Sequence, residues 1–439
     1  MIDKAGYIYV TGSSWGINSQ YITTIKYDIY GNTIWTLAHP MEYCFAVTGN
    51  HIEVDSQGNI IVAGGVIKTS ADSLNFLTFK IDAAGNVLWS RVFEQSNVFD
   101  WIYGLEVDTF DNVYVVGFSN RTGNCPCRCD VLLLKYDTNG NFQWNSFYDS
   151  PSNQEGDFAY DICVDENGCA YLVGKLEGLG TGPHFGILKY SPDGQLVWEK
   201  RYLTGRAVSV LYDPAGFVFV GGARNEDFFV VKLDTNGNEI WSASQDGHGG
   251  ADIIWDMAMD SDKNLFVTGW STGIDNRFDL LTIKYDSTGH LCWTMAYDGS
   301  AEEDYPGDYV DAIVVDEFGD VYITGGTIEI GTSYDLTTIK YTEQVTPVDI
   351  IVLMTASIED LVKSGVRLSL YFLLFLIVIR EGRGIGIYFS ARFRGRTRFC
   401  LEIPSCPRQP GIIIVAGHVT WDCWSPRLSS ASQKVSKKG

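Results

Sequence analysis

A unit that recurs seven times over residues 2–341 constrains this chain more than any other feature of its sequence. In each copy a short apolar stretch ends in glycine and a lysine follows; six copies close with a tryptophan, and the glycines are 47 to 57 residues apart. The three series are Gly12, Gly64, Gly117, Gly174, Gly222, Gly269 and Gly325; Lys26, Lys80, Lys135, Lys189, Lys232, Lys284 and Lys340; and Trp35, Trp89, Trp144, Trp198, Trp241 and Trp293. Such a period is typical of folds that repeat one small supersecondary unit.

Each copy predicts four short strands. In the fourth copy they cover residues 160–165, 171–174, 187–190 and 196–198, rich in Val, Ile, Tyr and Leu. An Asp-x-x-Gly turn precedes the second strand and another precedes the fourth, with Asp capping the turn and Gly supplying its positive φ. Four antiparallel strands in 40 to 50 residues match one propeller blade. The expected fold is therefore all-β, a seven-bladed β-propeller of four-stranded antiparallel blades.

The repeat predicts one propeller domain over residues 1–345 and a different tail over residues 346–439. The first copy lacks its first strand and the seventh lacks its tryptophan strand, so the N-terminus is expected to be truncated, and residues 348–354 are a candidate for one missing strand. The tail is expected to be irregular or partly helical, with a short helix at residues 356–366. It is interpreted either as a basic, membrane-seeking segment or as a frameshifted reading frame, and its apolar run is too short to span a membrane.

The propeller region is strongly acidic, with 48 Asp and Glu against 19 Lys and Arg, whereas the tail has 6 against 13. This balance argues against nucleic acid as a partner, because phosphates would be repelled. It suits a monomeric extracellular or cell-surface protein that attracts cations.

Candidate binding residues come from the connections that vary between copies. The two Asp-x-x-Gly turns must lie on one face of the ring, so the loops of variable length lie on the other, where function concentrates. Carboxylates beside aromatic rings can bind sugars, and clustered carboxylates can hold Ca²⁺, the one cofactor considered; a solvated acidic rim is the alternative. The candidates are Trp15, Asp100, Trp101, Asp149, Asp157, Asp246, Asp252, Trp270, Glu303 and Asp304.

Two sets of cysteines are weak candidates for chemistry. Cys125, Cys127 and Cys129 lie at alternate positions and could bind a soft metal, form a disulfide or remain free thiols. Cys163 and Cys169 flank a turn and could form a disulfide in an oxidising compartment or remain buried thiols.

The seven lysines predict structural ion pairs. An aspartate ends the first strand of each copy, and a lysine packed between sheets needs a partner. These aspartates are Asp3, Asp55, Asp108, Asp165, Asp213, Asp260 and Asp316.

No catalytic residue is predicted, because the six histidines show no metal-ligand spacing and Gly12-Ser13-Ser14-Trp15-Gly16 lacks the strand-to-helix context of a nucleophile elbow. The segments "VDSQGNIIVAGG", "VDTFDNVYVVGFS" and "KYDTNGNFQW" resemble the SBBP-type β-propeller repeat of secreted and cell-surface bacterial and archaeal proteins. That resemblance covers residues 2–341 and implies a propeller and an extracellular location, but no activity.

Two functions follow as expectations. The first is a non-catalytic binding or scaffold module that contacts a glycan, peptide or protein through its variable loops. The alternative is an enzyme with a site in the ring centre, quinoprotein-like or hydrolytic, because "KYDxxGNxxW" is also similar to the tryptophan-docking repeat of eight-bladed quinoprotein dehydrogenases. An enzyme should show inward polar residues that differ from blade to blade, and a binding module should show exposed aromatic rings.

Overall fold

The computed structural model describes the repeat region with gaps in its loops. The described residues are 1–15, 20–39, 46–67, 74–94, 99–120, 129–150, 156–178, 182–247, 250–273, 277–297, 308–327, 335–342, 351–352, 377–381, 384–388 and 400–401.

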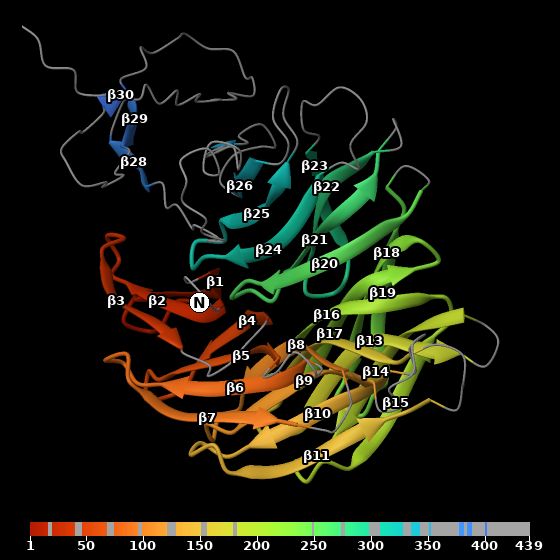
Figure 1. Cartoon of the computed structure of the whole chain (residues 1–439). Helices are drawn as coiled ribbons and strands as arrows, with labels where there is room; N and C mark the ends of the chain where they lie inside the picture. Colours follow the sequence, from red (N-terminus) through yellow and green to blue (C-terminus); the bar gives the residue numbers. More distant parts are fainter. Residues whose placement is uncertain are drawn as a thin grey trace, which may run out of the picture.

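Seven antiparallel sheets follow one another in chain order around a common centre (Figure 1). The first three blades are β1 (Ile8–Trp15), β2 (Gln20–Tyr27) and β3 (Thr33–His39); β4 (Ala46–Val54), β5 (Ile60–Ile67), β6 (Asn75–Ile81) and β7 (Val87–Phe93); and β8 (Phe99–Val107), β9 (Val113–Asn120), β10 (Asp130–Tyr136) and β11 (Phe142–Tyr148). The next two are β12 (Phe158–Val164), β13 (Ala170–Gly178), β14 (Gly182–Tyr190) and β15 (Leu196–Tyr202); and β16 (Gly205–Asp213), β17 (Phe217–Arg224), β18 (Asp227–Asp234) and β19 (Glu239–Gln245). The last two are β20 (Asp252–Met259), β21 (Leu265–Thr272), β22 (Phe278–Tyr285) and β23 (Leu291–Tyr297); and β24 (Tyr309–Val315), β25 (Val321–Thr327), β26 (Asp335–Tyr341) and β27 (Ile351–Val352).

The blades confirm the predicted seven-bladed propeller. Strands lie in chain order within each sheet, and the first strands of consecutive blades, such as β8 and β12, contact one another at the centre. In the first blade, Ile2 bridges to Ile8 at the position where the other blades have a first strand. β27 pairs with β26 as the fourth strand of the seventh blade, which is one of the two roles predicted for residues 348–354.

Burial follows the position of a strand within its blade. Every residue of β10 is buried, because the middle strands have a neighbouring blade on each face. The fourth strand β11 lies at the outer edge, and six of its seven residues are exposed or partly exposed. The core therefore consists of apolar layers between successive blades, as where Val116 and Leu133 of the third blade pack with Leu172 of the fourth.

The Asp-x-x-Gly turns are capped as predicted. The Oδ1 atom of Asp137 accepts hydrogen bonds from the backbone N–H of Asn139 at 2.9 Å and of Asn141 at 2.8 Å. Gly140 closes this turn with φ of 74°, a conformation that costs glycine little.

The repeated lysine and tryptophan bind the next blade. Lys80 Nζ and Trp89 Nε1 both donate to the carbonyl oxygen of Thr138, each at 3.1 Å, in the turn of the following blade. Trp144 and Lys135 share the carbonyl of Pro192 in the same way, at 2.9 and 3.2 Å. The two residues that mark the repeat in the sequence thus join consecutive blades.

The lysine–aspartate prediction is confirmed at one pair and does not describe the general contact. Lys80 forms an ion pair of 2.7 Å with Asp55, as predicted, but Lys340 pairs with Asp320 at 2.5 Å rather than with Asp316. Lys189 instead donates to the carbonyl of Thr235 at 2.8 Å. Its ammonium also lies 4.9 Å from the centre of the Tyr171 ring. Four of the repeated lysines donate to a carbonyl of the next blade and lie over an aromatic ring, namely Lys26, Lys135, Lys189 and Lys232.

A small sheet of β28 (Ile377–Glu381), β29 (Gly384–Tyr388) and β30 (Cys400–Leu401) is described in the tail. The predicted helix at residues 356–366 lies outside the described residues. In the part of the chain that the structure describes, no helix is long and apolar enough to cross a membrane.

Candidate functional site

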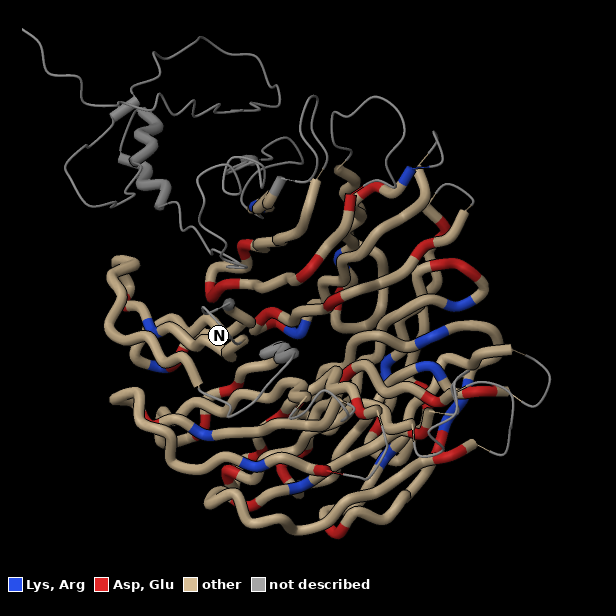
Figure 2. The backbone as a smooth tube through the Cα atoms, in the orientation of Figure 1, with Lys and Arg blue, Asp and Glu red and all other residues tan. Residues whose placement is uncertain are grey.

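The two faces of the propeller differ, as the turn pattern predicts. We call the face with the Asp-x-x-Gly turns the turn face. We call the opposite face, with the connections between second and third strands and between blades, the loop face. Asp and Glu residues are spread along the described blades (Figure 2), and the excess of 48 Asp and Glu over 19 Lys and Arg in residues 1–345 disfavours polyanions as ligands.

Three predicted loop-face aspartates are buried where a new blade begins. Asp100, Asp157 and Asp252 are 0%, 2% and 1% exposed. The Asp157 carboxylate accepts the N–H groups of Ser150 at 2.6 Å and Glu177 at 2.8 Å. Asp252 likewise accepts the N–H groups of Gly247 and Thr272, so Asp157 and Asp252 both hold loop backbone in place.

The other candidates have varied positions. Asp149 and Asp246 are exposed, Trp101 and Trp270 are half-buried, and the Trp270 ring centre lies 4.2 Å from that of Phe278. The backbone of Trp15 ends β1. Glu303, Asp304, Cys125 and Cys127 lie outside the described residues. Cys129 is buried. Cys163 and Cys169 are free thiols and form no disulfide with each other.

An aromatic cluster surrounds Trp101 on the loop face. β8 contributes Phe99, Trp101 and Tyr103 at alternate positions, and β12 contributes two rings in the same way. Ring centres lie 5.2 Å apart for Tyr103 and Tyr160, and 6.3 Å apart for Phe99 and Trp101. Phe99 is 42% exposed. The aromatic cluster consists of Phe99, Trp101, Tyr103, Phe118, Phe158 and Tyr160.

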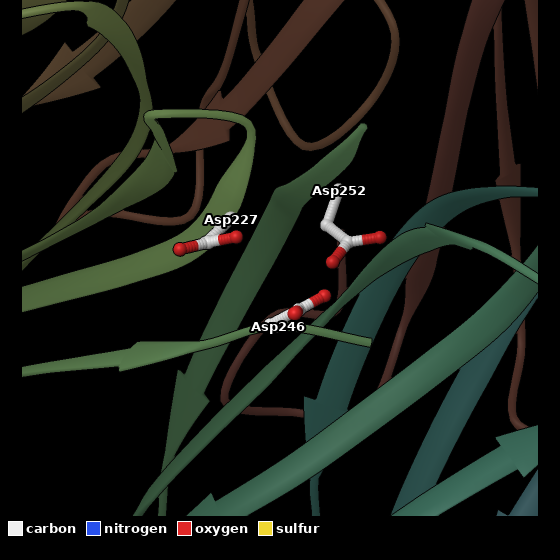
Figure 3. A group of neighbouring side chains, drawn as sticks. All are labelled: Asp227, Asp246 and Asp252. Carbon is white, nitrogen blue, oxygen red and sulfur yellow. The ribbon is translucent and has the colours of Figure 1, made fainter. Parts of the chain in front are cut away.

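An acidic trio lies at the junction of the fifth and sixth blades (Figure 3). Asp227 begins β18, Asp246 follows β19, and Asp252 begins β20. One carboxylate oxygen from each lies within 4.8 Å of the others. Burial, and then the charges of Asp246 and Asp252, raise the pKa of Asp227. Among the residues that the structure describes, this is the one group of three acidic, histidine or cysteine side chains close enough to share a metal ion.

The first strands bring a third set of carboxyl groups to the ring centre. Each of the six complete first strands has a β-bulge at the corresponding position, for example between Ala159 and Asp161 in β12. The Asp161 Oδ2 accepts the N–H of Val210 in the next first strand at 2.8 Å, and Asp256 Oδ2 accepts that of Ile313 at 2.9 Å. The first strand is the inner edge of each sheet, where backbone groups have no further strand to pair with, and these aspartates accept two such N–H groups.

Burial perturbs the titration of these inner carboxyl groups, which are Glu53, Glu106, Asp161 and Asp256. It raises the pKa of Asp161 to about 7 and of Asp256 to about 6. It raises the pKa of Glu53 to about 7, and that of Glu106 well above the ordinary value with help from the Glu53 charge. All four are only partly exposed. Burial also lowers the pKa of His51 to about 4.

The sequence reasoning missed the inner carboxyl groups, most of the aromatic cluster and Asp227. The signal for the aromatic cluster was present as Phe99-x-Trp101-x-Tyr103 and Phe158-x-Tyr160, a period of two that puts side chains on one face of a strand. The inner carboxyl groups had no such signal, because a bulge shifts the alternation within each first strand.

No family model and no curated protein matches this chain. Solved structures do: the β-propeller domain of the trilobed protease from Pyrococcus furiosus is 11% identical over 76% of this chain and 89% of that one, with a TM-score of 0.46. The Hadza microbial sialidase Hz136 is 10% identical over 75% and 74%, with a TM-score of 0.43. A protein of unknown function from Bacteroides caccae is 13% identical over 66% and 93%, with a TM-score of 0.40.

Proposed function

We propose that this propeller is a binding module that takes a neutral glycan on its loop face, at the aromatic cluster. The observation that carries the proposal is the contiguous set of rings from two adjacent blades, of which Phe99 is 42% exposed and Trp101, Tyr103, Phe158 and Tyr160 are half-buried. A sugar ring stacks on such a surface through its C–H groups, and rigid aromatic side chains lose little conformational entropy on binding.

Polar groups beside the rings suit a hydroxylated ligand. Lys175 Nζ lies 5.8 Å from the centre of the Phe158 ring, and Arg206 is close enough to lower the pKa of Tyr160 against the larger effect of burial, which raises it. Hydrogen-bonding groups next to an apolar platform are the usual composition of a small-ligand site.

The charge of the protein narrows the class of ligand. An acidic surface repels polyuronates, sulfated polymers and nucleic acids, particularly at low ionic strength. A neutral polysaccharide carries no charge and is not repelled by the acidic surface. The resemblance of the repeat to SBBP-type propellers supports a location outside the cell or on its surface, where such polymers occur.

The test is a binding titration with neutral β-linked oligosaccharides, cellohexaose and chitohexaose, on the full chain. Trp101→Ala and Tyr160→Ala should each weaken binding by about tenfold or more, because one stacked ring contributes about 1–3 kcal/mol. Phe110→Ala is the matched control, since Phe110 is 67% exposed in a turn on the opposite face. Binding that persists unchanged in Trp101→Ala, or no binding to either sugar, would contradict the proposal.

A hydrolytic enzyme is the second candidate, and the inner carboxyl groups favour it. A carboxyl group with a pKa near 7 is suited to act as a general acid. Asp161 and Asp256 already hold backbone amides, so Glu53 and Glu106 are the residues to change. Release of shorter sugars from chitohexaose by the wild type, lost in Glu106→Gln while binding remains, would favour the enzyme. No release over prolonged incubation would favour the binding module.

A further inference from the structure

We propose that Asp227, Asp246 and Asp252 form a Ca²⁺ site that joins the fifth blade to the sixth on the loop face. This site is separate from the aromatic cluster, which belongs to the third and fourth blades. Its ligands would come from three segments: the start of β18, the loop after β19 and the start of β20 (Figure 3).

The backbone accounts for the place of Asp252 but not for the convergence of the three carboxylates. The Asp252 Oδ2 accepts the N–H of Gly247 at 2.7 Å and its Oδ1 accepts that of Thr272 at 2.9 Å. Asp157 caps its own loop in the same way at the junction of the third and fourth blades. The capping arrangement thus works without a metal ion, and what needs another explanation is the approach of Asp227 and Asp246 to Asp252.

The spacing of the carboxylates fits a calcium ion. Oxygen ligands lie about 2.3–2.6 Å from Ca²⁺, so ligands on opposite sides of the ion are about 5 Å apart. The three oxygens of the trio, all within 4.8 Å of one another, can therefore share one ion. Three adjacent negative charges repel unless a proton or a cation neutralises them, and in the described part of the chain no lysine or arginine forms an ion pair with Asp227 or Asp252.

A buried hydroxyl group beside the trio lacks a partner. Ser271 is 3% exposed, and its Oγ atom has no hydrogen-bond partner in the described structure. Ser271 is the cross-strand neighbour of Asp252 in the ladder of β20 and β21. A Cβ atom on Gly247 would overlap Ser271 Oγ and lie 3.2 Å from Asp252 Oδ1, which places the hydroxyl and the carboxylate around the same point. An unsatisfied buried oxygen next to three carboxylates is the composition that Ca²⁺ selects, because it takes six to eight oxygen ligands.

The positions of the trio also recur in the sequence. Asp227 lies five residues before the repeated Lys232, and Asp246 lies five residues after the repeated Trp241. At the junction of the third and fourth blades the same positions hold Asp130 and Asp149, followed by Asp157. Among the described residues, the carboxylates at these positions come close enough to share an ion at the junction of the fifth and sixth blades but not at that of the third and fourth, so the convergence is specific to Asp227, Asp246 and Asp252.

The experiment is calcium titration of the full chain after removal of metals with a chelator, read by calorimetry and by melting temperature. Wild type should bind Ca²⁺ and melt at a higher temperature with it, because a ligand of the folded state stabilises that state. Asp246→Asn, at an exposed position, should weaken Ca²⁺ binding by about tenfold or more and reduce the shift in melting temperature. Asp227→Asn should do the same.

Asp262→Asn is the matched control, because Asp262 is an exposed acid of the same blade in the turn between β20 and β21, on the opposite face. It should leave both readouts unchanged. The proposal is overturned if wild type neither binds Ca²⁺ nor melts higher with it, if Mg²⁺ binds and Ca²⁺ does not, or if Asp246→Asn binds Ca²⁺ as tightly as Asp262→Asn. Because Asp246 is exposed and the change to asparagine keeps its size, this variant keeps the test valid even if Asp227→Asn fails to fold.

Discussion

The indole ring of Trp144, in the third blade, packs against Gly194 in a turn of the fourth. A Cβ atom on Gly194 would lie 2.7 Å from two carbons of that ring, and φ of this glycine is 79°. The same contact recurs between Trp89 and Gly140 and between Trp241 and Gly289. At these junctions the glycine of the turn before the fourth strand therefore has two functions, closing its own turn and receiving the tryptophan of the previous blade.

Gly194→Ala should destabilise the propeller more than an alanine at an equally left-handed glycine in open space. Gly58 provides the control, with φ of 79° and no atom within 4 Å of the position that an alanine Cβ would occupy. We expect Gly58→Ala to lower the unfolding free energy by about 1 kcal/mol through its φ alone, and Gly194→Ala by about 3 kcal/mol through φ and overpacking together. Urea unfolding measures both, and equal losses would show that the tryptophan contact contributes nothing.

Lys80→Met should be the most costly change among the repeated lysines tested. Lys80 and Asp55 are both buried and 2.7 Å apart. Burial alone would raise the pKa of Asp55, but Lys80 and Asn59 more than offset it and the pKa is lowered. Removing the Lys80 ammonium leaves the buried Asp55 carboxylate without its cation, which should lower the unfolding free energy by about 3–5 kcal/mol. Lys189→Met removes a hydrogen bond to a carbonyl and a contact with a π face, which should lower the unfolding free energy by about 1–2 kcal/mol. A similar loss in both variants, measured by urea unfolding, would contradict the special role of the Lys80–Asp55 pair.

Asp157→Ala tests whether the buried loop-face aspartates are structural. The change leaves the N–H groups of Ser150 and Glu177 without their acceptor, which should cost about 2–4 kcal/mol. Asp149→Ala, at an exposed position eight residues earlier, should stay within about 0.5 kcal/mol of wild type. Equal and small effects of the two variants on thermal unfolding would contradict the structural role of Asp157 and leave it a candidate ligand-binding residue.

Glu53→Gln should stabilise the protein increasingly as pH rises. Burial raises the pKa of Glu53 to about 7, above the unfolded value of about 4.3. Between these values the folded chain holds more protons than the unfolded chain, so the contribution of Glu53 to stability falls as pH rises through that window. The variant lacks this loss of stability. At pH 8 its free energy of unfolding should therefore exceed that of wild type by about 1 kcal/mol, after allowance for the partial exposure of Glu53.

The difference between variant and wild type is the quantity to measure, because His51 titrates in the opposite sense over an overlapping range. Glu317→Gln, at an exposed turn position, controls for the loss of one negative charge. A difference that does not change between pH 5 and pH 8 would show that Glu53 has an ordinary environment.

The fold could be predicted from the sequence because each repeated residue has a local task. Asp137 caps its turn, Gly140 closes it, and Trp89 packs on it. Because each blade needs these contacts, the same residue types recur at similar spacing in each copy. The partners of the lysines could not be predicted in general, because a lysine can be satisfied equally by a carboxylate or by a carbonyl with an aromatic face. Lys80 and Lys189 occupy equivalent positions and both donate to a carbonyl of the next blade, but Lys80 adds an ion pair with Asp55, whereas Lys189 lies over the Tyr171 ring.

The candidate sites were predictable only in part, because they depend on differences between blades. Trp101 was selected from its loop, but its neighbours Tyr103 and Tyr160 become part of one surface only when two blades pack together. Asp246 and Asp252 were selected as acids of one loop, whereas Asp227 begins a strand and gives no separate signal.

The most direct test of the proposed loop-face site is hydroxyl-radical footprinting of the full chain with and without the oligosaccharide that binds it. The account predicts reduced oxidation of Phe99, Trp101, Tyr103 and Tyr160 in the complex. It also predicts unchanged oxidation of Phe110 and Phe318, which are 67% and 77% exposed on the turn face. Protection of Phe110 or Phe318, with none at Trp101, would place the ligand on the other face and contradict the account.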